Sequence, residues 1–186
     1  MPHPPRDWIE VDTCCLFIAM KETQVSDSRA QGSWVIALSF VFAFYLSILP
    51  FPVWAESWRP EWVALVLIYW AFALPSRVGV ISGWFAGLGL DVLEGVTLGQ
   101  HALSLTVLAY LAGHLHRRVR VFPLWQQSLS VLVLVGINLL LVRMVQSSVG
   151  QVETGLVYWI PSLISALLWP WLFAILRFFQ HYFHVR

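Results

Sequence analysis

Residues 60–75 read PEWVALVLIYWAFALP, an apolar run that begins at one proline and ends at another. Pro60 suits the first turn of a helix, where its missing N–H would have no partner in any case. The apolar residues form a block and not the stripe that the surface helix of a soluble protein carries. The run therefore predicts a helix that lies in lipid or inside a bundle of other helices.

The composition of the whole chain agrees with this interpretation. Of the 186 residues, 59% are hydrophobic and only 11% are charged, whereas a soluble domain carries about 25% charged residues. A bilayer core of about 30 Å requires roughly 20 apolar residues for each helical span. The roughly 150 residues after Gly32 are enough for five or six spans with short loops, which leaves little for a soluble domain.

We predict an all-α integral membrane protein in which about six transmembrane helices form one bundle. The predicted spans are residues 33–49, 60–74, 78–93, 100–115, 123–149 and 156–179. They lie in a transmembrane domain of residues 32–180, between a polar leader of residues 1–31 and a tail of residues 181–186. The second and third spans reach only about 22–24 Å, so either the bilayer thins around them or the pair lies inside the bundle.

Basic residues indicate the orientation. Eight of them flank one set of span ends, and the opposite loops contain only Arg59. The eight are Lys21, Arg29, Arg77, Arg117, Arg118, Arg120, Arg177 and Arg186. Because lysine and arginine mark the cytoplasmic side, we expect both termini in the cytoplasm of a bacterial inner membrane. A re-entrant hairpin made by the second and third spans would leave four full spans and the same placement of the termini.

The polar leader permits two interpretations. It is either a cytoplasmic tail without fixed structure, or translation starts at Met20 and residues 1–19 come from an over-extended reading frame. Cys14 and Cys15 are adjacent, so they cannot staple a fold, and no spacing suggests a metal site. A cleaved signal peptide is disfavoured, because the apolar run after Trp34 is long for a signal core and two prolines follow it.

The third span and the loop after it, GVISGWFAGLGLDVLEGVTLGQHAL at residues 79–103, contain the candidate site residues. Gly79, Gly83, Gly87 and Asp91 recur every four residues and share one helical face. In a membrane, a face of small residues lets another backbone approach closely. This face predicts either packing inside the chain or a docking site for a partner's transmembrane helix.

Asp91 ends that face at the outer end of the span. It is either a solvated carboxylate or helix cap, or one half of an ion pair, because acidic residues inside a membrane usually have a partner. Of the two candidate partners, Arg59 and Arg143, we prefer Arg143, which is the only basic residue inside a span. Gly95 and Gly99 in the following loop permit backbone angles that other residues resist.

Nothing in the sequence indicates an active site. It lacks a Ser/His or Cys/His pairing at usable spacing, an HExxH motif, a phosphate loop and paired intramembrane aspartates. We therefore predict that the chain is not an enzyme and uses no metal or cofactor.

Short motifs follow one another in a fixed order from residue 31 to residue 180. They are Gln31-Gly32-x-Trp34-Val35-Ile36, Arg59-Pro60-x-Trp62-Val63-x-Leu65, Tyr69-Trp70, Ala73-Leu74-Pro75-x-Arg77-Val78, Gly83, Gly87, Asp91, Gly95, Thr97-Leu98-Gly99, Ala102-Leu103, Leu124-Trp125-Gln126-Gln127 and Leu168-Trp169-Pro170-Trp171. In this order and spacing the chain resembles the MreD family, the rod shape-determining membrane proteins of the bacterial cell-wall elongation machinery.

The resemblance implies a non-enzymatic scaffold that binds MreC, acts with MreB, RodA and a class B penicillin-binding transpeptidase, and helps control peptidoglycan synthesis. The family fold is similar to the six-helix substrate-binding subunits of energy-coupling-factor transporters. That likeness supplies an alternative function, the binding of a small molecule in an outward cavity. Whether the chain pairs with a second copy, and whether membrane lipid is a specific ligand, stay open.

Overall fold

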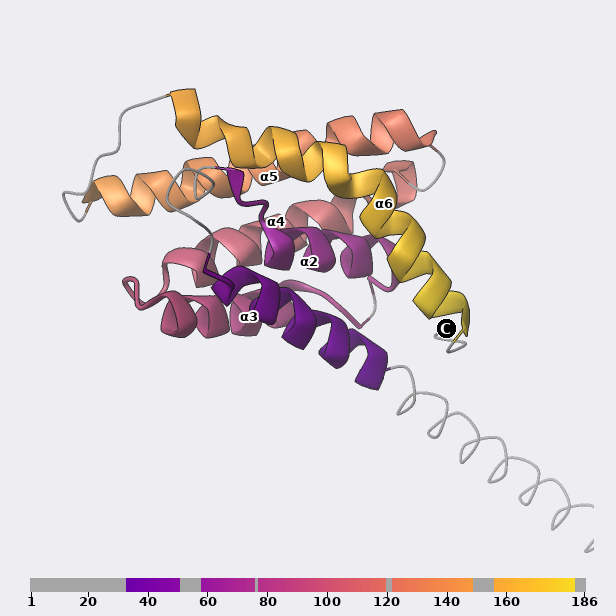
Figure 1. Ribbon diagram of the computed structural model, residues 1–186, viewed down its shortest axis with the longest axis horizontal. Helices are drawn as coiled ribbons and strands as arrows, with labels where there is room; N and C mark the ends of the chain where they lie inside the picture. The colour runs from indigo at the N-terminus through magenta and orange to yellow at the C-terminus, as the bar shows by residue number, and fades with distance from the viewer. Residues whose placement is uncertain (1–32, 51–57, 76, 120–121, 149–155, 183–186) are drawn as a thin grey trace, which may run out of the picture.

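The computed structural model describes residues 33–50, 58–75, 77–119, 122–148 and 156–182 (Figure 1). The leader, with Cys14, Cys15 and the Met20 start, and the tail of residues 183–186 lie outside the described residues. The described residues form a helix at Ser33–Ile48, α2 (Trp62–Ala73), α3 (Val80–Glu94), α4 (Gln100–Val119), α5 (Leu124–Ser148), the short 3-10 helix η2 (Leu156–Trp159) and α6 (Ile160–Tyr182).

The six α-helices confirm the all-helical prediction, and each corresponds to one predicted span. The helix α4 continues past Leu115 to Val119, because Arg117 and Arg118 in its last turn interact favourably with the C-terminal end of the helix dipole. By length and composition, α5 and α6 are able to cross a membrane. The chain is therefore compatible with a membrane protein.

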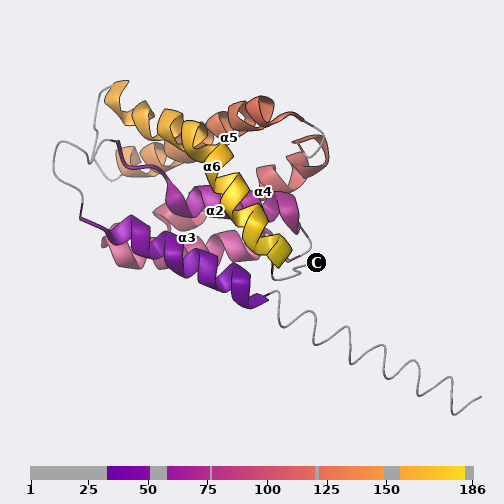
Figure 2. The same ribbon diagram turned by 45° about the vertical axis from the view of Figure 1, so that its right-hand side comes forward.

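The helix α2 is at the centre of the bundle. Every residue from Val63 to Phe72 is buried, and α2 contacts α4, α5 and α6. Figures 1 and 2 show it surrounded from both angles. A helix that is apolar on all sides is stable only when it is covered on all sides. Its 12 residues extend about 18 Å, so this short helix lies inside the bundle, whereas α3 exposes Ile81, Trp84 and Phe85 on its outer face.

Three hydrogen bonds fix α2 among its neighbours. The indole Nε1 of Trp70 donates to Oγ of Ser39 at 2.7 Å. The hydroxyl of Tyr69 donates to Oε1 of Gln180 at 2.8 Å. At the start of α2, the backbone N–H of Glu61 donates to Oγ of Ser165 at 3.1 Å. These bonds connect α2 to the helix Ser33–Ile48 and to α6, where bulk water supplies few alternative partners.

Pro170 lies in the interior of α6, which continues through it as one helix to Tyr182. A proline removes one backbone hydrogen bond and bends the helix axis. Figure 1 shows α6 changing direction along its length, so that its C-terminal half crosses the bundle. This agrees with a kink at the Trp-Pro-Trp sequence.

The helices alternate in direction, which gives the bundle two ends. At the Asp91 end, α3 finishes and α2 and α4 begin; at the Arg77 end, α2 finishes and α3 begins. The names Asp91 end and Arg77 end are used below for these two ends.

Replacing Trp70 tests the central position of α2. Trp70 is fully buried, so Trp70→Ala leaves a cavity and removes the hydrogen bond to Ser39, and we expect a loss of about 3–5 kcal/mol in the free energy of unfolding. The measurement is reversible chemical denaturation in detergent micelles. Trp171→Ala is the matched control, because Trp171 is 74% exposed. Equal losses in the two variants would contradict a central α2.

Candidate functional site: the junction of helices α3 and α4

Two glycines bring α3 into direct contact with the backbone of α4. A Cβ atom at Gly83 would lie 2.7 Å from the carbonyl oxygen of Leu105 and 2.9 Å from Cβ of Ala109. A Cβ atom at Gly87 would lie 2.5 Å from the backbone nitrogen of Ala102 and 2.5 Å from the carbonyl oxygen of His101. Only glycine permits so close an approach of two helices.

This contact occupies the small-residue face of α3. The sequence left two alternatives for that face, packing inside the chain or docking of a partner's transmembrane helix. Of the two alternatives, the structure supports packing inside the chain, and Gly83 and Gly87 leave no space for a second helix. The physical reason is that α4 follows α3 after a short loop and covers the nearest small-residue face. Gly79 differs from them, because a Cβ atom there would meet nothing within 4 Å.

The loop between the helices reverses the chain with two left-handed glycines. Gly95 ends α3 with φ 66°, and Gly99 precedes α4 with φ 102°. Both φ values fall in the region that side-chain-bearing residues avoid. The expectation that Gly95 and Gly99 serve unusual backbone angles is confirmed. The reversal directs the N-terminus of α4 back toward Asp91 in the last turn of α3.

The Asp91 carboxylate binds the N-terminus of α4. Its Oδ2 accepts hydrogen bonds from the backbone N–H of Gly99 at 2.8 Å and of Ala102 at 3.3 Å. Its Oδ1 accepts from the backbone N–H of His101 at 2.8 Å and lies 2.9 Å from Nδ1 of the same residue. The first N–H groups of a helix have no partner within the helix, and here a residue of the preceding helix supplies one.

These contacts explain how a carboxylate can be fully buried. The side chain of Asp91 is 0% exposed, and an isolated buried charge is strongly disfavoured. Hydrogen bonds from three backbone N–H groups, together with the positive end of the helix dipole, compensate for the lost hydration. Asp91 is thus a helix cap, one of the alternatives that the sequence left open, but it caps the next helix and not its own.

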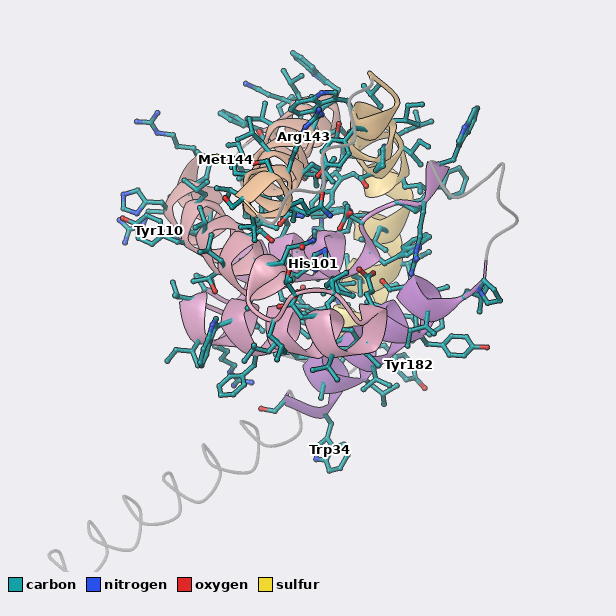
Figure 3. The ribbon with its side chains drawn as sticks, turned by 90° about the vertical axis from the view of Figure 1, so that its left-hand side faces the viewer. Trp34, His101, Tyr110, Arg143, Met144 and Tyr182 are labelled. Atoms are coloured by element: carbon teal, nitrogen blue, oxygen red, sulfur yellow. The ribbon has the colours of Figure 1, made fainter. Side chains whose placement is uncertain are left out.

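Two further contacts, both to Glu94, lie next to this cap. Nε2 of His101 lies 3.8 Å from Oε2 of Glu94, and Nη2 of Arg59 lies 3.9 Å from Oε1 of Glu94. We call Arg59, Asp91, Glu94 and His101 the Asp91 cluster. Figure 3 looks onto this end of the bundle and shows His101 near its centre. The cluster joins the segment before α2 to the α3–α4 junction.

The structure does not bring Asp91 and Arg143 together as the preferred ion pair. The guanidinium carbon of Arg143 lies 5.1 Å from the centroid of the Tyr158 ring, in a cation–π contact. Figure 3 shows Arg143 away from the central His101. The Asp91 carboxylate is already satisfied by α4, and the other candidate cation, Arg59, pairs with Glu94. The aromatic ring of Tyr158 takes the place of the expected counter-ion.

His101 is the site residue that the sequence analysis missed. It is buried with Asp91 and contacts two carboxylates. A signal was present in the sequence, because His101 is the only titratable residue in the first turn of the fourth span, one short loop after Asp91. Among the described residues, no group of three or more His, Cys, Asp or Glu side chains could hold a metal ion. The contacts of this cluster hold the end of α3, the start of α4 and the segment before α2 together.

Gly87→Ala tests the close approach of α3 and α4. The added methyl group would collide with the α4 backbone, and backbone cannot move aside as a flexible side chain can. We expect a loss of about 1–3 kcal/mol or more in the free energy of unfolding. Gly79→Ala is the control, since its Cβ has open space, and it should lose less, up to about 1 kcal/mol, because Gly79 is the N-cap of α3. A stable Gly87→Ala protein would show that the helices are farther apart.

Asp91→Ala tests the cap. The substitution leaves the N-terminal N–H groups of α4 without their acceptor, and we expect a loss of about 2 kcal/mol. Glu94→Ala removes a carboxylate that is 29% exposed, so its loss should stay below about 1 kcal/mol. Denaturation in micelles measures both variants. A larger effect at Glu94 than at Asp91 would overturn the cap.

Comparison with known proteins identifies the family. The family model described as rod shape-determining protein MreD matches residues 28–179. The rod shape-determining protein MreD of Haemophilus influenzae is 38% identical over 148 residues, which cover 77% of this chain and 90% of that protein. No solved structure matches the chain. The chain therefore belongs to the MreD family of rod shape-determining proteins.

Proposed function

We propose that this protein is a non-enzymatic membrane scaffold of the cell-wall elongation machinery, which binds MreC and helps control peptidoglycan synthesis and rod shape. The observation that carries the proposal is family membership over nearly the whole transmembrane domain. The further partners would be MreB, RodA and a class B penicillin-binding transpeptidase. The fold would be similar to the substrate-binding subunits of energy-coupling-factor transporters.

The topology that we propose is multi-pass, in the bacterial inner membrane, with both termini in the cytoplasm. The Arg77 end would face the cytoplasm, because the basic residues gather there. The Asp91 end would face the periplasm. Exposed tryptophans support a membrane position, since Trp34 and Trp125 lie at the Arg77 end and Trp58 and Trp159 lie at the Asp91 end. Tryptophan favours the interface between lipid and water.

The surface available to a partner's helix differs from the one that the sequence suggested. The faces of Gly83 and Gly87 are covered by α4, so MreC would contact exposed apolar side chains instead. Each outer helix offers some of these, for example Val41, Trp84, Leu129 and Leu167. A docking face and a lipid-facing one are both apolar, so the face that binds MreC is identified by crosslinking.

The alternative function, binding of a small molecule in an outward cavity, would use the Asp91 end, which faces the periplasm in this topology. There the polar side chains of the Asp91 cluster contact one another or the α4 backbone. A groove that the structure does contain lies at the Arg77 end. The scaffold function is therefore the one that we put to the test.

Site-specific photo-crosslinking in a rod-shaped bacterium tests the scaffold function. The full chain replaces the resident copy, with a photoreactive phenylalanine at Val41, Trp84, Leu129 or Leu167, one on each of four outer helices. We expect rod shape to be maintained and MreC to be crosslinked from one helix or two neighbouring helices, because one partner helix covers one face. The same cells without illumination are the control.

Two results would contradict the proposal. One is a rounded cell shape even though the unmodified chain is inserted and abundant. The other is a rod-shaped strain in which no position crosslinks MreC. A crosslink between two copies of the chain would locate a homodimer face and would leave the MreC face among the other helices.

A further inference from the structure

An open groove separates the helix Ser33–Ile48 from α3. It has a volume of about 870 Å³ and begins at the Arg77 end. Aliphatic and aromatic side chains dominate its walls. The principal ones are Ile36, Phe40, Phe44, Val78, Ile81 and Phe85. The groove is therefore suited to an apolar occupant.

The groove extends only halfway along the bundle. The two helices meet where the ring of Phe44 approaches Gly89, with Cζ only 3.2 Å from the position of a Cβ atom. From Ser33 to Phe44 the helix rises about 16 Å, which is about half of a hydrocarbon core of roughly 30 Å. A transmembrane helix of a partner would need the full length and a width of about 10 Å. An acyl chain of one leaflet needs half the length and less width.

The mouth of the groove is polar and basic. Arg77 lines it together with Ser33 and Ser82. Ser82 donates its hydroxyl to the carbonyl oxygen of Gly79 at 2.7 Å, and Arg77 supplies the positive charge of the lining. Guanidinium binds phosphate oxygens with two parallel hydrogen bonds.

The charges of the described residues also differ between the two ends, although Arg59 and Arg143 lie toward the Asp91 end. The carboxylates Glu61, Asp91 and Glu94 lie at the Asp91 end. The helix ends near Arg77 carry Arg117, Arg118 and Arg177 in addition. A positive field at one end favours anionic over neutral lipid headgroups.

We propose that this groove binds one anionic phospholipid, with its phosphate at Arg77 and an acyl chain along Phe40 and Phe85. The bound lipid fills the space between the helix Ser33–Ile48 and α3 and holds the two helices in register. The proposal does not depend on where MreC binds; of the proposed function it rests only on insertion of the bundle into a membrane.

Photoreactive lipids in nanodiscs test the site. The full chain is placed in phosphatidylcholine nanodiscs that contain a trace of phosphatidylglycerol or phosphatidylcholine with a diazirine in the acyl chain. We expect the phosphatidylglycerol probe to label the peptides that contain Phe40 and Phe85 roughly fivefold more than the phosphatidylcholine probe does. One basic residue at a membrane surface favours an anionic lipid by about this factor. The discs contain no MreC, so the result is independent of the scaffold function.

Matched variants distinguish a direct contact between Arg77 and the lipid headgroup from the overall positive charge at the Arg77 end. Arg77→Gln should abolish the fivefold preference. Arg117→Gln removes the same charge from the same end but lies outside the groove, so it should keep most of the preference. Equal losses in the two variants, or equal labelling by the two probes in the unmodified protein, would overturn the headgroup assignment.

A second pair of variants tests the acyl-chain position. Gly79→Leu should fill the groove and remove labelling by both probes, and Ala37→Leu on the opposite wall should do the same. Gly113→Leu is the control, since Gly113 also has open space around it but lies on α4, away from the groove. Size-exclusion chromatography verifies that each variant is folded. The site would be overturned if labelling were spread evenly over α5 and α6, or if it were unchanged in both Gly79→Leu and Ala37→Leu. A co-purified protein helix in the groove would also overturn it.

Discussion

The bond between the Asp91 carboxylate and the N-terminus of α4 is the contact on which the rest of the bundle depends. It fixes the depth of α4 relative to α3, because the backbone N–H groups of Gly99, His101 and Ala102 converge on two oxygen atoms. At that depth, Gly83 and Gly87 face α4 backbone, and no larger residue could take their place. A shift of α4 by one residue would both uncap the helix and bring side chains into the glycine contact.

The α3–α4 pair in turn positions the helices that pack around α2. A short, uniformly apolar helix has no preferred face, so its position depends on the helices that surround it. The helix α4 contacts α2, α3 and α5, and α6 closes the remaining side. Hydrogen bonds from Trp70 and Glu61 then fix the rotation and depth of α2. In the membrane position that we propose, dispersion contacts supply most of the stability, since apolar burial gains little there.

The two ends of the bundle differ in their charges and in how closely their helices pack. At the Asp91 end, the side chains of Arg59, Asp91, Glu94 and His101 contact one another within the chain, which gives a compact junction. At the Arg77 end, the helix Ser33–Ile48 and α3 diverge and leave a groove with a basic mouth. Among the described residues, this groove is a space between helices that the side chains leave incompletely filled. Lipid is the occupant whose length and charge suit it.

The sequence by itself determined the number of helices and their approximate bounds, because prolines, glycines and charges interrupt the apolar runs that a membrane requires. It also determined that Gly83, Gly87 and Asp91 share a face and that Gly95 and Gly99 make a turn. Only the tertiary structure decided what covers that face, that Asp91 binds α4 and not Arg143, and that a groove follows Ser33–Ile48. These features depend on which helices become neighbours, and helical periodicity defines the faces of a helix without specifying their partners.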